Sequence, residues 1–157
     1  MPDIPTLVTE RLSLRPMTFG DWPSYLAIMS SDRARYMGGP VTAGHAWGMF
    51  CADHAQWDLF GLGALMLDER ATGRCVGQVG INSGPLFPEP EIGWFVFPQG
   101  EGRGYAFEAA CALRDWARGT GRVKTLVSYI DPENFRSCRL AERLGARLDP
   151  LASEDVV

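Results

Sequence analysis

The chain has 157 residues, of which 46% are hydrophobic and 22% charged, and its formal net charge at pH 7 is −4. This size and apolar content suit one globular domain, so we expect a single domain over residues 1–157. The acidic balance disfavours a nucleic-acid partner. The sequence shows no apolar run long enough to cross a bilayer and no N-terminal signal core, so no membrane partner is expected.

The first half of the sequence predicts one strand followed by two helices. The partly alternating pattern of residues 7–17 is typical of a strand. Residues 18–21 resemble a capping box, and apolar side chains then repeat at helical spacing at Trp22, Tyr25, Leu26 and Met29. Thr42 is the expected N-cap of a second helix that ends near Asp58.

The second half predicts more strands than helices. Residues 62–67 and 75–81 flank a turn and predict a β-hairpin, and the aromatic and branched residues 92–97 predict a further strand. A helix follows, then a strand over 124–130, a last helix and a short strand over 146–149. The predicted order is β-α-α-β-β-β-α-β-α-β, which indicates an α/β (α+β) fold.

The cysteines and histidines indicate neither disulfides nor a metal. The four cysteines are Cys51, Cys75, Cys111 and Cys138. They lack CxxC spacing and are interpreted as reduced, buried small residues, which predicts a reducing, cytoplasmic compartment. His45 and His54 are nine residues apart, which is not the spacing of a helical ligand pair, so no metal is expected.

A glycine-rich turn joins the strand at 92–97 to the next helix. Gly100, Gly102 and Gly104 occupy alternate positions there, and glycine lets backbone N–H groups approach a ligand closely. The helix start adds unpaired donors and a positive dipole end, so the expected ligand is an anion, most simply a pyrophosphate. The alternative is a loop that only turns the chain. A dinucleotide fingerprint is disfavoured because Lys124, not an acid, opens the next strand.

A second segment, residues 131–137, follows about thirty residues later with the sequence DPENFRS. Asn134 and Ser137 are three residues apart at a helix start and therefore share one face. The alternative is that Asn134 only caps the helix while Ser137 faces solvent. Together the two segments predict a site for a long, phosphate-ended thioester.

These segments, in this order, resemble the two cofactor motifs of the GNAT acetyltransferases. Residues 9–16, TERLSLRP, resemble the first strand of the ribosomal-protein N-terminal (RimJ/RimL-type) branch. The resemblance runs from about Leu7 to Ala146. It implies the acyl-CoA N-acyltransferase fold, helices on both faces of a mixed sheet, and acetyl-CoA as cosubstrate without a metal.

The resemblance also implies the cofactor contacts. In the family, pantetheine lies where the fourth strand diverges from the fifth, and the strand backbone that would meet it is that of Trp94, Phe95 and Val96. Backbone donors for the pyrophosphate would be Gly102, Arg103, Gly104, Tyr105 and Ala106, with Asn134 on pantetheine. Glu101 departs from the family's usual Arg, Gln or Trp, and Arg103 is expected to compensate for its charge. Arg136, Arg139 and Lys124 are further candidates for the nucleotide phosphates.

Ser137 is the implied proton donor to the departing sulfur. Many members carry a tyrosine four residues later, where this chain has Ala141. Ser137, another group or water must then protonate the thiolate, with Tyr105 and Tyr129 as outside candidates.

Glu91, at the start of the fourth strand, is the leading general base, acting through water, and His54 is the alternative. The alternative for Glu91 is that it is only a solvated acid at the start of a strand. An α-amine, with a pKa of about 7.7–8.0, needs less help than a lysine to become neutral. No histidine lies near Cys138 in sequence, so direct attack is expected rather than an acyl-enzyme.

We therefore predict an acetyl-CoA-dependent N-acetyltransferase that acts on a protein N-terminus or a small amine. The alternative is a non-catalytic acyl-CoA sensor of the same fold. The expected acceptor pocket is formed by the first two helices and the turn at 36–40, with candidate walls Trp22, Tyr25, Trp47 and Trp57. The family continues with two strands after its last helix, whereas only residues 146–157 remain here. The exposed edge at 124–130 is therefore expected to be covered by residues beyond Val157 or by a second copy in a homodimer.

Overall fold

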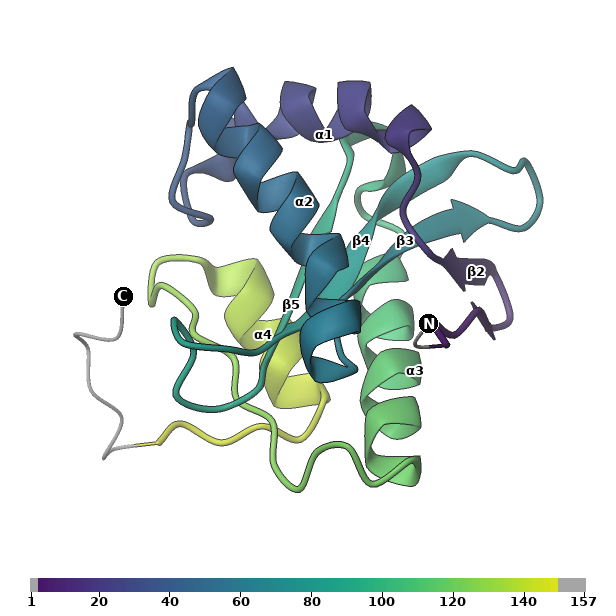
Figure 1. The fold of residues 1–157 in the computed structure, drawn as a ribbon, viewed down its shortest axis with the longest axis vertical. Helices are drawn as coiled ribbons and strands as arrows, with labels where there is room; N and C mark the ends of the chain where they lie inside the picture. The colour runs from purple at the N-terminus through teal and green to yellow at the C-terminus, as the bar shows by residue number, and fades with distance from the viewer. Residues whose placement is uncertain (1–2, 150–157) are drawn as a thin grey trace.

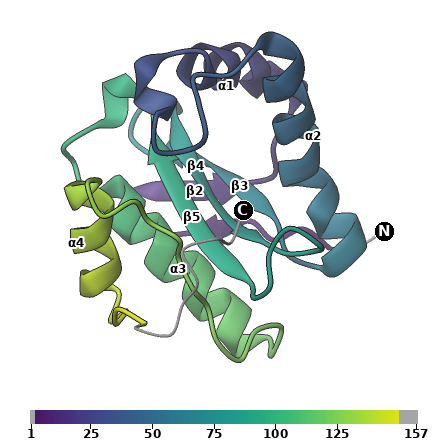
Figure 2. The ribbon, with the colours of Figure 1, turned by 90° about the vertical axis from the view of Figure 1, so that its left-hand side faces the viewer.

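The structure is a computed structural model that describes residues 3–149. Its strands are β1 (Leu7–Val8), β2 (Leu12–Arg15), β3 (Ala64–Glu69), β4 (Cys75–Asn82) and β5 (Glu91–Val96). Its α-helices are α1 (Trp22–Met29), α2 (Ala43–Phe60), α3 (Tyr105–Gly119) and α4 (Phe135–Arg143). The strands form one antiparallel sheet in the order β1-β2-β3-β4-β5. Helices α1 and α2 cover one face of this sheet, and α3 and α4 cover the other (Figures 1 and 2).

The predicted hairpin is confirmed. β3 pairs with β4 antiparallel, and its turn is closed where the Glu69 N–H donates to the Arg74 carbonyl at 2.8 Å. Gly73 completes this turn with a φ of 76°, a conformation that side chains with a Cβ disfavour. The second helix begins as predicted, because the Thr42 hydroxyl accepts from the His45 N–H at 3.2 Å.

Three details of the predicted strands are wrong. Residues 7–17 form two short strands, because the Thr9 N–H donates to the Leu12 carbonyl at 2.8 Å and closes a turn between them. Residues 124–130 form no strand and make only one parallel bridge to β5, between Glu91 and Val127. Residues 146–149 form no strand. The expectation about the chain end rests partly on residues 150–157, which lie outside the described residues.

Two apolar cores flank the sheet. Between the sheet and α3, the side chains of Ala109, Ala110, Leu113 and Ala117 are fully buried and form the apolar face of that helix. On the opposite face, Tyr25, Phe50 and Phe97 pack under α1 and α2. Within residues 3–149, no helix is long and apolar enough to cross a membrane.

Candidate functional site

The first feature of the site is an opening between β5 and residues 128–131. The Ile92 N–H donates to the Val127 carbonyl at 2.8 Å, and the Ser128 hydroxyl donates to the Ile92 carbonyl at 2.9 Å. Beyond this point the two segments share no further backbone hydrogen bond among the described residues. The direction of backbone polar groups alternates along a strand, so the N–H and C=O groups of Trp94 and Val96 point into the opening.

Phe95 differs from its two neighbours in this respect. Its backbone faces β4, where it pairs with Gln78 and lies against Gly77. The expectation that Phe95 presents backbone groups to pantetheine is therefore corrected, because strand alternation turns them toward the sheet. Its side chain instead packs with Tyr25 on the face covered by α1.

The glycine-rich turn leads from β5 into α3 as predicted. Gly102 and Gly104 both have a φ of 76°, and Gly104 is the residue that precedes the first turn of α3. A Cβ atom at Gly104 would meet only the Arg11 guanidinium, at 3.6 Å, so the outer side of this turn is open. The first N–H groups of α3 are unpaired within the helix and point toward that space.

Side chains behind the turn hold it in place. The Tyr105 hydroxyl donates to the Glu69 carboxylate, which also accepts from Arg103 at 3.0 Å. These bonds, led by that of Tyr105, lower the pKa of Glu69. Arg11 donates to the Arg103 carbonyl at 2.7 Å and pairs with Glu108 at 2.7 Å. Arg103 and Tyr105 thus turn their side chains away from the open side and leave only their backbone groups there.

A groove of about 910 Å³ runs from this turn along α4. Its charged lining residues are Asp32, Arg33, Arg35, Glu101, Arg136, Arg139 and Arg143. Five of these seven are arginines, so the groove favours an anionic ligand. Arg136 and Arg139 lie here as predicted, whereas Lys124 does not line the groove. Glu101 is paired with Arg33 rather than with Arg103, so the expected compensation is present but comes from a different arginine.

The N-terminus of α4 stands at the inner end of the groove. The Asn134 side-chain oxygen accepts from the Ser137 N–H at 3.4 Å, so Asn134 caps the helix. The Ser137 hydroxyl accepts from the Trp94 indole at 3.2 Å, which leaves its own proton free for another acceptor. Both residues also line a second hollow. Asn134 therefore caps α4 and, like Ser137, also lines both hollows.

The second hollow is a cavity of about 410 Å³ on the α1–α2 side of the sheet. Gly80 and Gly93, which pair across β4 and β5, lie in its floor. A Cβ at Gly93 would meet only the Glu91 carboxylate, at 4.0 Å. The cavity walls are largely apolar, with methionine and aromatic side chains at Met29, Met37, Met49, Phe87 and Phe95.

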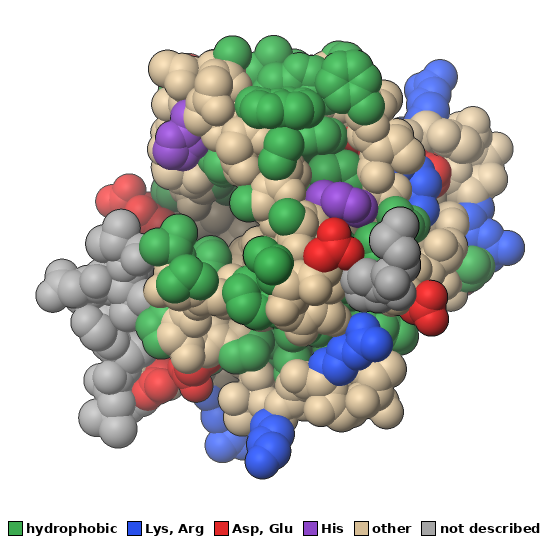
Figure 3. Space-filling model, viewed as in Figure 1, with side chains coloured by type: hydrophobic (Ala, Val, Ile, Leu, Met, Phe, Trp, Pro, Cys, Tyr) green, Lys and Arg blue, Asp and Glu red, His purple; other side chains and the backbone are tan. Residues whose placement is uncertain are grey.

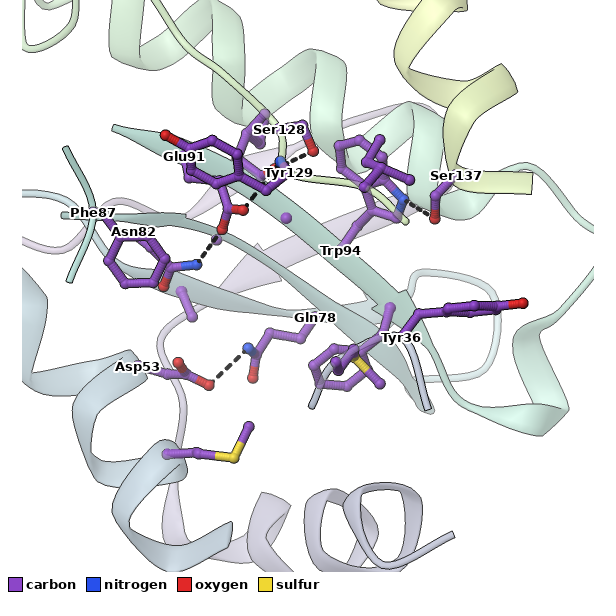
Figure 4. Close-up of a pocket in the computed structure, with 18 of the residues that line it drawn as sticks. Tyr36, Asp53, Gln78, Asn82, Phe87, Glu91, Trp94, Ser128, Tyr129 and Ser137 are labelled. Carbon is purple, nitrogen blue, oxygen red and sulfur yellow. Dashed lines mark hydrogen bonds between the residues drawn. The ribbon is translucent and has the colours of Figure 1, made fainter. Parts of the chain in front are cut away.

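Glu91 points into this cavity from the start of β5 (Figure 4). One carboxylate oxygen accepts from the Asn82 amide at 3.0 Å, and the other accepts from the Tyr129 N–H at 3.2 Å. Burial raises the pKa of Glu91, and these two hydrogen bonds limit the rise. A carboxylate whose pKa lies above its usual value is better matched to accept a proton near neutral pH.

Asp53 is a site residue that sequence reasoning missed. It extends from α2 to β4, where its carboxylate accepts from the Gln78 amide at 3.0 Å and from the Tyr25 hydroxyl at 2.9 Å (Figure 4). Burial raises the pKa of Asp53 from 3.8 to about 6. The sequence signal that could have found it is the spacing of Met49, Asp53 and Gln56, which places all three on one face of the helix. Asp53 and Gln56 therefore lie on the same face as the apolar Met49, which turns toward the interior.

Other predicted wall residues lie elsewhere. Of the four aromatic candidates only Tyr25 lines the cavity. Trp57 is buried and donates to the Ala64 carbonyl at 2.8 Å. Trp22 and Trp47 pack edge to face, with Phe19 against Trp47, and Phe19 and Trp47 are exposed. A hydrophobic surface lies over α1 and α2 in Figure 3. His54 does not line the cavity.

Comparison with known proteins identifies the family. Residues 11–147 match the acetyltransferase (GNAT) domain family. An acetyltransferase structure from Agrobacterium tumefaciens is 55% identical, covering 98% of this chain and 90% of that one, with a TM-score of 0.94. A GNAT-family acetyltransferase from Bacillus anthracis is 26% identical, covering 90% and 83%, with a TM-score of 0.75.

The chain belongs to the GNAT acetyltransferase family, and its fold implies acyl-CoA-dependent acetylation. The predicted α/β class is confirmed together with the family. The likeness to the ribosomal-protein branch is distant. A structure of RimL, a ribosomal L7/L12 α-N-protein acetyltransferase, is 16% identical over 88% of this chain and 81% of that one, with a TM-score of 0.70.

Proposed function

We propose that this protein transfers an acetyl group from acetyl-CoA to a primary amine by direct attack. The observation that supports this proposal is that the groove and the cavity meet at one point. The arginine-lined groove and the cavity share Trp94, Asn134 and Ser137 among their lining residues. A thioester laid along the groove would reach the cavity at this junction, where an amine is expected to approach from the other side.

The residues along the groove fit such a cosubstrate. The Trp94 and Val96 backbone groups offer strand-like hydrogen bonds to the amides of pantetheine. The N–H groups from Gly102 to Ala106 offer donors to a pyrophosphate, and the arginines on α4 offer charge to phosphates. When bound, acetyl-CoA supplies the activated acetyl group. A backbone N–H in the opening can stabilise negative charge on the carbonyl oxygen during attack.

The side chains of the site then accept and donate the protons of the reaction. The amine nitrogen bonds to the acetyl carbon as the carbon–sulfur bond breaks, and the proton lost by the nitrogen passes through water to Glu91. The Ser137 hydroxyl donates its proton to the departing sulfur and regains one from water. Tyr105 is committed to Glu69 and is not available for this step. Tyr129 lines the cavity and is the remaining hydroxyl candidate.

Two measurements test this function. Calorimetric titration with acetyl-CoA should show binding, and a thiol-release assay with small amines and with peptides carrying a free N-terminus should show turnover. Binding without turnover for every amine would favour the non-catalytic sensor instead. Absence of acetyl-CoA binding by the folded protein would contradict both functions.

A further inference from the structure

We propose that the acceptor is a compact cationic amine without a carboxylate or phosphate group, and that its far end donates a hydrogen bond to Asp53 and Gln78. This inference rests on the proposed function, because it assigns the substrate class of the same site. It goes beyond that function by separating small cations from amino-acid-like acceptors.

The first argument is the difference in charge between the two hollows. The charged residues that line the cavity are Asp53, Glu91 and Asp131. Among the described lining residues of the cavity, none is a lysine, arginine or histidine, whereas five arginines line the groove. An acceptor carboxylate would therefore enter a partly apolar space next to like charges and without a cationic partner, which disfavours its binding. A cationic acceptor would instead lie next to opposite charges, those of Asp53, Glu91 and Asp131.

The second argument is the kind of hydrogen bonds that remain unused. Gln78 is 7% exposed, and its side-chain oxygen is buried with no partner among the described residues. Its amide nitrogen is already committed to Asp53. Asn82 likewise gives its nitrogen to Glu91, while its oxygen accepts from the Gln56 amide at 3.3 Å. The Asp53–Gln78 pair therefore offers acceptors, so the part of the ligand that reaches it should carry N–H donors.

The third argument is the spacing of the two polar groups. In the β4–β5 ladder Asn82 pairs with Glu91, and Gln78 pairs with Phe95. Gln78 and Asn82 are four residues apart on β4, which corresponds to roughly 13 Å along a strand. Between them lies the Gly80–Gly93 pair, and the missing side chain of Gly93 leaves this part of the floor open. An amine placed near Glu91 can therefore extend across this floor toward the Asp53–Gln78 pair.

Figure 4 shows this arrangement. Asp53 and Gln78 form one pair toward α2, and Asn82 and Glu91 form a separate pair near Tyr129. Methionine and aromatic side chains fill the walls, so the ligand needs an apolar body between its two polar ends. A volume of about 410 Å³ suits a small molecule rather than a folded chain segment with bulky side chains.

Three probes that differ by single groups test the proposal. Cadaverine carries two amines, pentylamine lacks the second amine, and lysine adds a carboxylate to cadaverine. We expect kcat/KM for cadaverine to exceed that for pentylamine by about tenfold, the usual value of a hydrogen bond to a charged group. We expect it to exceed that for lysine by at least about a hundredfold.

Variants assign the effect to Asp53. Asp53→Asn should reduce the cadaverine-to-pentylamine ratio to near one while acetyl-CoA affinity stays unchanged. Asp58→Asn is the matched control, because Asp58 is exposed on the same helix and does not line the cavity. It should keep the ratio of the natural chain. Far-ultraviolet circular dichroism and melting curves establish that both variants are folded.

The outcomes separate this inference from the proposed function. Equal turnover of lysine and cadaverine, or a ratio that Asp53→Asn leaves unchanged, would overturn the inference while acetyl transfer stands. If no amine is acetylated, calorimetry with each amine in the presence of coenzyme A decides. Tighter binding of cadaverine than of lysine would then support the charge selection although the proposed function fails, and equal or absent binding would overturn both.

Discussion

Gly104→Val should abolish acetyl-CoA binding without unfolding the protein. Gly104 has a φ of 76°, and a residue with a Cβ pays about 1–2 kcal/mol in this left-handed region. Its Cβ would meet only Arg11, at 3.6 Å, so no steric clash adds to that strain. The melting temperature should therefore fall by roughly 2–8 °C for a domain of this size. The branched side chain would occupy the space in which phosphate approaches the start of α3, so the dissociation constant should rise at least about a hundredfold.

Gly121→Val provides a matched control. Gly121 has a φ of 74°, lies beyond the other end of α3, and has nothing within 4 Å of its ideal Cβ position. Both variants should lose similar stability, but only Gly104→Val should lose acetyl-CoA binding in calorimetry. If Gly104→Val is folded and binds acetyl-CoA normally, the assignment of the pyrophosphate to this turn is wrong. Equal loss of binding in both variants would point to a general effect of strain.

The remaining predictions concern the junction and the cavity. Ser137→Ala should lower kcat by about ten- to a hundredfold while acetyl-CoA affinity changes little, and unchanged kcat with chemistry rate-limiting would remove Ser137 from the mechanism. Gly93→Val should raise KM for amines by more than about tenfold and leave acetyl-CoA affinity intact, because the valine side chain would extend from the cavity floor into the cavity. Unaltered amine kinetics would show that acceptors bind elsewhere. The free energy of unfolding of Asp53→Asn should rise relative to that of the natural chain as pH increases from 4 to 7.5, by at most about 3 kcal/mol. A difference in melting temperature between the two proteins that does not vary with pH would refute the raised pKa.

The sign of the Asp53 prediction follows from proton binding. The folded pKa is about 6 and the ordinary value is 3.8, so the folded state binds more protons between these values. The free energy of unfolding therefore falls as pH rises through this window, and the contribution is lost above the folded pKa. Asparagine does not titrate and removes this dependence. The side chains of Tyr25, Glu91, Tyr129 and Asp131 also line the cavity and remain present in both proteins.

The part of the site that depends on local sequence was predictable. The turn from Gly100 to Gly104 and the start of α3 require particular backbone conformations, so the residue types themselves carry the information. The same holds for Asn134 and Ser137, whose spacing at a helix start fixes their common face. Asn134 and Ser137 line both the groove and the cavity beside β5.

The parts that depend on tertiary pairing were not predictable. Residues 124–130 have the composition of a strand, yet they diverge from β5 after Val127 and gain no ladder on that side. Strand propensity reports how well a side chain fits a pleated surface, not whether a partner strand is present. The partner of Glu101 was misassigned for the same reason, since Arg33 is close only in space.

The buried carboxylate of Asp53 is more readily explained by function than by stability. A carboxylate with a raised pKa destabilises the folded state at neutral pH, because desolvation of the charge exceeds what the hydrogen bonds from Tyr25 and Gln78 return. A cationic ligand would reverse this balance by supplying the missing counter-charge in a space of low polarity. Binding of such a ligand should therefore lower the pKa of Asp53. It should also relieve the desolvation penalty that the Asp53 carboxylate imposes on the free protein.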